Sequence, residues 1–290
     1  HVIGPALGLT LPGATVVCGD SHTCTHGALG ALAFGIGSTE IVHVLATQTL
    51  AQRKPRNMRL RFDGAPGTGV GAKDLILSAI GRYGADAGSD YAVEYAGDAI
   101  SRMGMEARLT LCNLSIEFGA KYGFIAPDDT CIEWIAGRLH APQGADFERA
   151  AAAWRQLRSD DDARFEREEC IDASRVAPTI TWGTSPEHAM PVDGVIPDPA
   201  HADAATAAAW RKALDYMALE PGRPIAGTPI DFVFIGSCTN SRLDDLRAAA
   251  AVVGGRKVAP RVEAWVVPGS AAVKRAAEAE GLASLFTAAG

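Results

Sequence analysis

The stretch ATVVCGDSHTCTHGALGALAFGIGSTEIVHVLATQTL, residues 14–50, indicates the fold class. Residues 14–18 predict a short strand, and a polar loop over residues 19–26 follows it. After a Gly/Ala-rich apolar run, apolar side chains from Ile41 to Leu50 recur at helical spacing, and we expect Ser38 to cap this helix. A strand, a polar loop and a helix in this order predict an α/β protein.

Composition excludes several classes of protein. The 290-residue chain is 48% hydrophobic and 21% charged, which excludes an intrinsically disordered or fibrous protein. Its apolar stretches are too short to span a membrane, so we expect no membrane partner. The net charge of −7 comes without a stripe of lysine and arginine, so we expect no nucleic-acid partner. Six scattered cysteines favour reduced thiols and a cytoplasmic location.

Proline-containing stretches divide the chain into candidate domains. Residues 53–56 give a first boundary, and five prolines within residues 177–200 give a second near residue 200. The strand–helix–strand–helix order after residue 200 predicts a parallel sheet with crossover helices. The elements expected beyond residue 55 are strands over residues 58–62, 91–95, 231–235 and 262–267, and helices over residues 72–80, 105–120, 146–158, from 242 and over 271–280.

Asp20, Ser21 and His22 follow the first strand, with His26 four residues further on and His1 upstream. Loops at the carboxyl ends of strands hold the ligands of open α/β sheets. A carboxylate, a hydroxyl and an imidazole in such a loop form a candidate acid/base site. In the alternative, Asp20 and Ser21 only cap a turn and His22 is an ordinary loop residue.

His22, Cys24 and His26 alternate, and an extended strand would place these three side chains on one face as candidate zinc ligands. Three residues this close do not complete a tetrahedral site, and no C-x-x-C pair accompanies them.

Cys238 lies in GSCTNS, residues 236–241, between an apolar strand and a helix. Ser241 and Asp244 have the spacing of a capping box, so we expect Cys238 just before the helix. A cysteine at a helix N-terminus has a lowered thiolate pKa, and Cys238 is a candidate nucleophile or iron ligand. The alternative is a small buried thiol at a turn.

Asn113 and Glu117 are four residues apart in the helix expected over residues 105–120, so one face would carry both. A carboxylate there needs a partner if it is buried; alternatively, this face is partly exposed to solvent.

Six segments together resemble the aconitase superfamily, and within it the family of 3-isopropylmalate dehydratase (isopropylmalate isomerase) large subunits. They run in family order and span nearly the whole chain. The segments are HVIGPALGLTLPGATVVCGDSHT (1–23), HGALGALAFGIGSTEIVHVLATQT (26–49), LTLCNLSIEFGAKYG (109–123), TWGTSP (181–186), FIGSCTNSRLDDLRAAA (234–250) and VVPGSAAVKRAAEAEGL (266–282).

The resemblance implies an aconitase-like fold of several three-layer α/β/α units with mostly parallel sheets. Residues 1–55 would be the C-terminal part of the first α/β domain, residues 56–200 the second, and residues 201–290 the N-terminal part of a third that carries Cys238. Because the chain starts at His1 without Met and stops at Gly290, we expect a fragment that lacks segments at both ends.

The resemblance also implies a [4Fe-4S] hydro-lyase. Cys238 matches the first of three cysteine ligands, and the other two belong to a C-x-x-C segment beyond residue 290. The cluster would therefore be absent or incomplete in this chain. No other cysteine lies in a matching motif; these are Cys18, Cys24, Cys112, Cys131 and Cys170.

Catalytic roles carry over to four residues and binding roles to two. Asp20 and His22 match the active-site Asp-Ser-His, His1 matches the histidine that partners the aspartate, and Glu117 matches the glutamate that orients the active-site histidine. Ser21 and Asn113 match substrate- and cluster-proximal positions.

The activity implied is isomerisation of 2-isopropylmalate to 3-isopropylmalate in leucine biosynthesis, by a cytoplasmic heterodimer with a small subunit. We expect this chain to be inactive alone. One alternative is a homoaconitase or a related substituted-malate isomerase. Others are a cluster-free protein that binds RNA, and a zinc or thiol enzyme that uses His22, Cys24 and His26.

Overall fold

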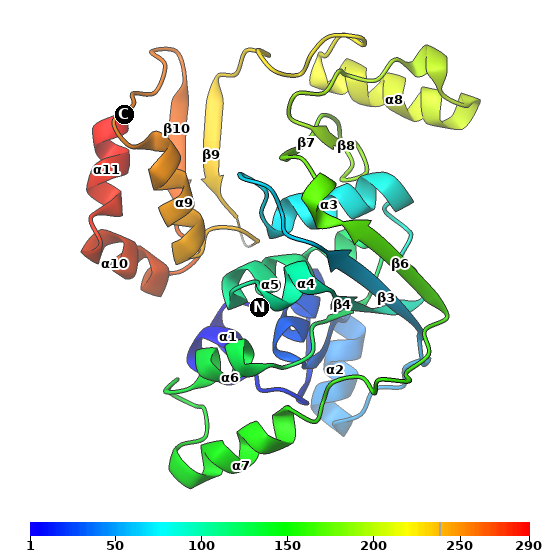
Figure 1. Ribbon diagram of the computed structural model, residues 1–290, viewed down its shortest axis with the longest axis vertical. Helices are drawn as coiled ribbons and strands as arrows, with labels where there is room; N and C mark the ends of the chain where they lie inside the picture. The colour runs from blue at the N-terminus through cyan, green and yellow to red at the C-terminus, as the bar shows by residue number, and fades with distance from the viewer. Residues whose placement is uncertain (238) are drawn as a thin grey trace. The chain divides into compact units, whose positions relative to one another are not determined.

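The computed structural model describes residues 1–237 and 239–290 (Figure 1). They form two compact units, the first made of His1 and Ile3–Gly227 and the second of Val2 and Thr228–Gly290. Helices alternate with strands, and all named strand pairs in the described part are parallel except one. This confirms the prediction of an α/β fold with mostly parallel sheets. Within the described residues, we find no helix with the length and apolarity needed to cross a membrane.

The first unit opens with helix α1 (Ile3–Leu7) and the parallel strands β1 (Thr15–Cys18) and β2 (Leu32–Gly35). The expected polar loop between the strands is a 3₁₀ helix, η1 (Ser21–Leu29). Gly27 lets η1 pack closely, because a Cβ atom there would lie 1.7 Å from the carbonyl oxygen of Gly123.

Helix α2 (Ser38–Thr47) follows β2, as predicted, but its cap lies one residue earlier. Gly37 is the N-cap, and its N–H donates to Glu40 Oε2 at 2.9 Å. Ser38 is therefore the first helical residue rather than the cap. The helix ends before Leu50 because Gln48 adopts a left-handed conformation.

A four-stranded parallel sheet forms the centre of the first unit, in the order β5-β4-β3-β6. Met58, Leu60 and Phe62 of β3 are fully buried, which confirms the alternation predicted for this strand. The strands are β3 (Arg56–Asp63), β4 (Tyr91–Ala96), β5 (Tyr122–Phe124) and β6 (Arg167–Asp172), and the helices between them are α3 (Ala72–Tyr83), α4 (Asp98–Ser101), α5 (Met105–Asn113), η2 (Ile116–Phe118), α6 (Asp129–Ile135) and α7 (Gly144–Trp154).

The single helix expected over residues 105–120 is wrong. Helix α5 ends at Asn113, and η2 follows as a separate turn that Gly119 closes in a left-handed conformation. Between them, the hydroxyl of buried Ser115 lies 2.8 Å from that of Tyr95 on β4. This contact holds the break in the core, so Asn113 and Glu117 do not share a helix face.

The proline-rich region contains more structure than the sequence predicts. After η3 (Ala173–Arg175), strands β7 (Thr179–Thr181) and β8 (Ala189–Pro191) form an antiparallel pair. Turn η4 (Pro199–His201) and helix α8 (Ala204–Met217) complete the first unit.

The second unit contains β9 (Phe232–Gly236), α9 (Leu243–Val253), β10 (Glu263–Val267), α10 (Ala271–Ala279) and α11 (Leu282–Ala289). The two strands are parallel, as predicted, and the three helices gather on one side of them (Figure 1).

A capping box is present at the start of α9, but it is formed by other residues than predicted. Arg242 is the N-cap, and its N–H donates to Asp245 Oδ2 at 3.0 Å. The hydroxyl of Ser241 donates to the carbonyl of Val267 instead. Ser241 thus ties the start of α9 to the end of β10.

An ion pair joins α5 to the start of α6. The guanidinium of Arg108 is fully buried and donates to Asp128 Oδ1 at 2.7 Å and Oδ2 at 2.6 Å. Burial alone would raise the pKa of the Asp128 carboxyl, but the hydrogen bonds from Arg108 outweigh it and lower that pKa. Asp128 also caps α6 by accepting from the N–H of Cys131.

We predict that Asp128→Asn lowers the free energy of unfolding by about 2 kcal/mol at pH 7, because it leaves a buried cation without its counter-charge. Asparagine retains the cap, so the loss reports the ion pair. The lowered pKa means that this stabilisation is present above about pH 4 and is lost as the pH falls through the folded-state pKa. Urea unfolding at pH 7 and pH 3 measures both effects.

The matched control is Asp129→Asn, because Asp129 pairs with Arg155 where both side chains are exposed. It should cost less than about 0.5 kcal/mol. Equal losses for the two variants would contradict a special role for the buried pair.

Candidate active site

Asp20 is the centre of the polar cluster at the carboxyl end of β1. Its Oδ1 accepts a hydrogen bond from the backbone N–H of His22 at 2.9 Å and so caps η1. Its Oδ2 lies 2.5 Å from Nδ1 of His1. One carboxylate therefore fixes both the turn that carries one histidine and the ring of the other.

The ring of His22 lies between polar groups on both sides. Nδ1 is 3.1 Å from Ser21 Oγ and 3.8 Å from Asp20 Oδ1, and Nε2 is 3.6 Å from Glu117 Oε1. The rings of His1 and His22 have centroids 6.1 Å apart. The structure thus brings together five of the six residues assigned to catalysis or binding outside the cluster cysteine.

Exposure differs between the members of this group. The side chains of His22, Asp20 and Glu117 keep 22%, 34% and 38% of their surface, whereas that of His1 keeps 6%. A solute can reach His22 and both carboxylates. Because a carboxylate only accepts hydrogen bonds, His1 Nδ1 donates the hydrogen bond that joins it to Asp20 Oδ2. The buried ring of His1 thus contacts Asp20 from the protein interior.

Asn113 lies apart from the exposed group, fully buried at the end of α5. Its Nδ2 donates to Thr25 Oγ1 at 2.8 Å, and Thr25 Oγ1 donates to the carbonyl of His22 at 2.6 Å. Asn113 is therefore connected to the backbone of His22 through one hydroxyl.

The alternation of His22, Cys24 and His26 does not form a ligand face. The residues lie in 3₁₀ helix η1, not in the extended strand that the zinc hypothesis requires, so this premise is wrong. Cys24 donates to the carbonyl of Asn113, and burial raises the pKa of its thiol to about 12. His26 is buried against Thr10. Across residues 1–237 and 239–290, we find no group of three or more His, Cys, Asp or Glu side chains arranged to hold a metal ion.

Cys238 lies outside the described residues. Near it in the sequence, Ser237 Oγ accepts from the N–H groups of Thr239 at 3.1 Å and Asn240 at 2.8 Å. Among the described cysteines, Cys24, Cys112 and Cys131 are buried and Cys18 and Cys170 are exposed, all as free thiols. The described residues alone therefore do not fit a complete iron–sulfur site.

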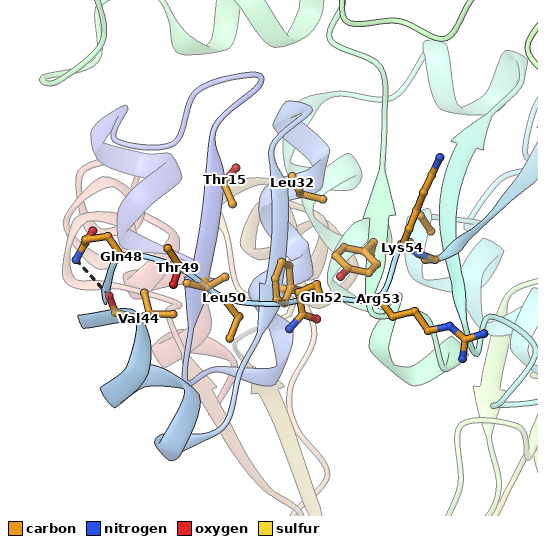
Figure 2. Close-up of a pocket in the computed structure, with 14 residues that line it drawn as sticks. Thr15, Leu32, Val44, Gln48, Thr49, Leu50, Gln52, Arg53 and Lys54 are labelled. Carbon is orange, nitrogen blue, oxygen red and sulfur yellow. Dashed lines mark hydrogen bonds between the residues drawn. The ribbon is translucent and has the colours of Figure 1, made fainter. Parts of the chain in front are cut away.

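A hollow of about 390 Å³ beside β1 and β2 lacks the acid/base group (Figure 2). Its lining is mostly apolar, with Arg53 and Lys54 at one side, and includes none of Asp20, His22 or Glu117. The chemistry that the sequence indicates is thus not located there.

Comparisons with known proteins show the family of the chain. A model of the aconitase family (aconitate hydratase) matches residues 1–290. The chain belongs to the aconitase family. It is 65% identical over 291 residues to 3-isopropylmalate dehydratase large subunit 1 of Bradyrhizobium diazoefficiens. The match covers 100% of this aconitase-family chain and 61% of the relative, so the chain spans less than two thirds of that protein.

Sequence reasoning missed two hydroxyl groups in the site of this aconitase-family chain. Thr25 links Asn113 to His22, and Thr10 contacts His26. A local signal existed for Thr25, because threonine in a turn often bonds a carbonyl three residues earlier. No local signal existed for Thr10, which meets His26 only in the folded chain.

We predict that native-state alkylation distinguishes the cysteines. In a Cys238→Ser background at pH 8, iodoacetamide should label exposed Cys18 readily and exposed Cys170 more slowly, because desolvation and the Asp63 carboxylate raise the pKa of the Cys170 thiol. It should leave Cys24, Cys112 and Cys131 unmodified. The pKa of the Cys24 thiol is about 12, and burial also raises the pKa of the other two buried thiols, so little reactive thiolate is present. Peptide mass spectrometry reads the result, and labelling in urea is the positive control. Rapid labelling of Cys24 in the native chain would contradict this prediction and favour the alternative of a thiol enzyme.

Proposed function

We propose that the whole protein, part of which this chain represents, is the large subunit of 3-isopropylmalate dehydratase. It interconverts 2-isopropylmalate and 3-isopropylmalate by dehydration and rehydration. Family membership and the 65% identity to a relative of that name support the proposal. The observation that carries it is the Asp20 carboxylate, which contacts His1 and holds the turn of His22.

Dehydration of a hydroxy acid breaks a C–H bond and a neighbouring C–O bond: a base takes the proton from carbon, an acid gives a proton to the leaving hydroxyl, and rehydration reverses both transfers. We assign the transfer to and from the hydroxyl to His22. His22 suits this task because an imidazole exchanges protons near neutral pH and this ring is reachable from solvent. Its Nε2 lies 3.6 Å from Glu117 Oε1. Glu117 is therefore placed to orient the ring.

Asp20 and His1 contribute to the same proton transfer by positioning His22. The carboxylate of Asp20 fixes the backbone of His22 and lies beside its ring, while Nδ1 of His1 fixes the carboxylate. Ser21 Oγ, 3.1 Å from His22 Nδ1, is placed to contact a substrate carboxylate. Asn113 supports the group from the core through Thr25.

The cofactor proposed for the whole protein is a [4Fe-4S] cluster with Cys238 as one thiolate ligand. Its open iron would supply Lewis-acid chemistry at the substrate hydroxyl. The resemblance to the family implies that the other two thiolate ligands belong to the rest of the whole protein, and we propose on that ground that this chain alone is inactive.

Domain layout, partner and compartment complete the proposal. Residues 1–55, 56–200 and 201–290 would belong to three successive α/β domains, and the partner would be the small subunit. The proposed compartment is the cytoplasm, because the described cysteines are free thiols, as expected of a protein under reducing conditions.

The test is a substrate panel with the whole large subunit and its small subunit, reconstituted anaerobically. We expect kcat/KM for 2-isopropylmalate to exceed those for citrate and homocitrate at least 100-fold. Faster turnover of homocitrate would favour a homoaconitase and contradict the substrate assignment. No turnover of any of the three, together with salt-dependent RNA binding, would favour the cluster-free binding protein. This chain assayed alone is the negative control.

A further inference from the structure

His26 lies in a buried polar contact that the proposed chemistry does not use. Its Nδ1 is 2.7 Å from Thr10 Oγ1, and the two residues keep only 5% and 3% of their surface. Other hydrogen bonds of η1 join it to Asp20, to the carbonyl of His22 or to the buried carbonyl of Asn113. This contact instead joins η1 to the segment that follows α1.

Helix α1 lies directly on the His26–Thr10 pair. A Cβ atom at Gly4 would be 2.8 Å from Thr10 Oγ1 and 3.1 Å from His26 Cε1, so only a glycine allows this approach. The Gly4 carbonyl accepts from the N–H groups of Leu9 at 2.9 Å and Thr10 at 3.3 Å. The first turn of α1 thus rests on both polar side chains.

The other end of α1 is held by different groups. Nη1 of Arg138 donates to the carbonyl of Ala6 at 2.8 Å, and the N–H of His140 donates to that of Leu7 at 2.9 Å. The His26–Thr10 pair therefore supports the end of α1 that begins two residues after His1. A shift at this end would move the His1 ring, whose Nδ1 is 2.5 Å from Asp20.

His26 is unsuited to carrying protons itself. Burial lowers the pKa of its imidazole to about 4, so the ring is neutral under ordinary conditions. A neutral ring can keep one fixed hydrogen-bonding arrangement with Thr10 across the neutral pH range, which suits a structural support.

We propose that His26 is a positioning residue: with Thr10 it supports the first turn of α1 and so sets the place of His1 against Asp20. The proposal rests on the proposed function, because it assumes that the His1–Asp20 contact serves the reaction. It gives a role to the one histidine of the polar loop that lies outside the exposed group.

The test compares Thr10→Val with Thr10→Ser, and His26→Leu with His26→Asn, in the whole large subunit with its small subunit. Valine and leucine remove the hydrogen bond, whereas serine and asparagine can keep it. His43→Asn, on the exposed face of α2, is the matched histidine control. One readout is steady-state kinetics. The other is the imidazole ¹⁵N spectrum, in which the Nδ1–H signal of His1 reports its contact with Asp20 and is assigned with a His1→Gln sample.

We expect Thr10→Val and His26→Leu to lower kcat roughly tenfold or more with KM within about twofold, since small misplacements of catalytic groups act on the chemical step. The His1 signal should shift or broaden in both. Thr10→Ser and His26→Asn should keep kcat within about twofold of wild type and leave the His1 signal in place, and His43→Asn should change neither.

Wild-type kcat and an unchanged His1 signal in both disruptive variants would overturn the proposal, as would a rise in KM alone. If either variant does not fold, Gly4→Ala is the substitute test, because it keeps both polar side chains and pushes α1 away from them. The proposal then requires Gly4→Ala to show the same loss of kcat and the same change of the His1 signal. If the wild-type enzyme turns over no isopropylmalate, the proposed function fails, and the ¹⁵N spectra still decide whether the pair positions His1.

Discussion

The candidate site depends on the two hydrogen bonds of the Asp20 carboxylate. One oxygen caps η1 through the N–H of His22, and the other meets Nδ1 of His1. Asp20 lies two residues after the end of β1, and the pairing of β1 with β2 fixes the position of its backbone. A side chain two residues beyond a paired strand is well placed for this task, because the strand end cannot move without breaking the sheet.

Support for this carboxylate comes from the core side of η1. Asn113 reaches the His22 carbonyl through Thr25, and Gly27 allows η1 to pack against β5. The partly exposed groups to which we assign proton exchange thus lie on and beside a turn whose other face is buried. Such an arrangement keeps reacting groups at fixed distances without burying their charges, which would be costly.

Local patterns predicted much of the fold. The alternation in β3, the parallel order of β9 and β10, and the sequence Asp20-Ser21-His22 after a strand all depend on neighbouring residues, and the structure confirms these placements. The break between α5 and η2 was not predictable, because it depends on Ser115 meeting Tyr95 from another strand. For the same reason, sequence alone could not separate partly exposed His22 from buried Cys24 and His26, which belong to one turn. The roles that the resemblance assigns stay predictions, and Cys238 lies outside the described residues.

The most direct test of the account is a double-mutant cycle between Asp20→Asn and His1→Gln in the whole enzyme. Asparagine can still cap η1, so Asp20→Asn removes mainly the charge that His1 contacts. If the two residues act as one unit, each single variant should lower kcat/KM by roughly 100-fold, and the double variant should be little worse than the weaker single variant. Losses that simply multiply in the double variant would show that His1 and Asp20 act independently and would contradict the account.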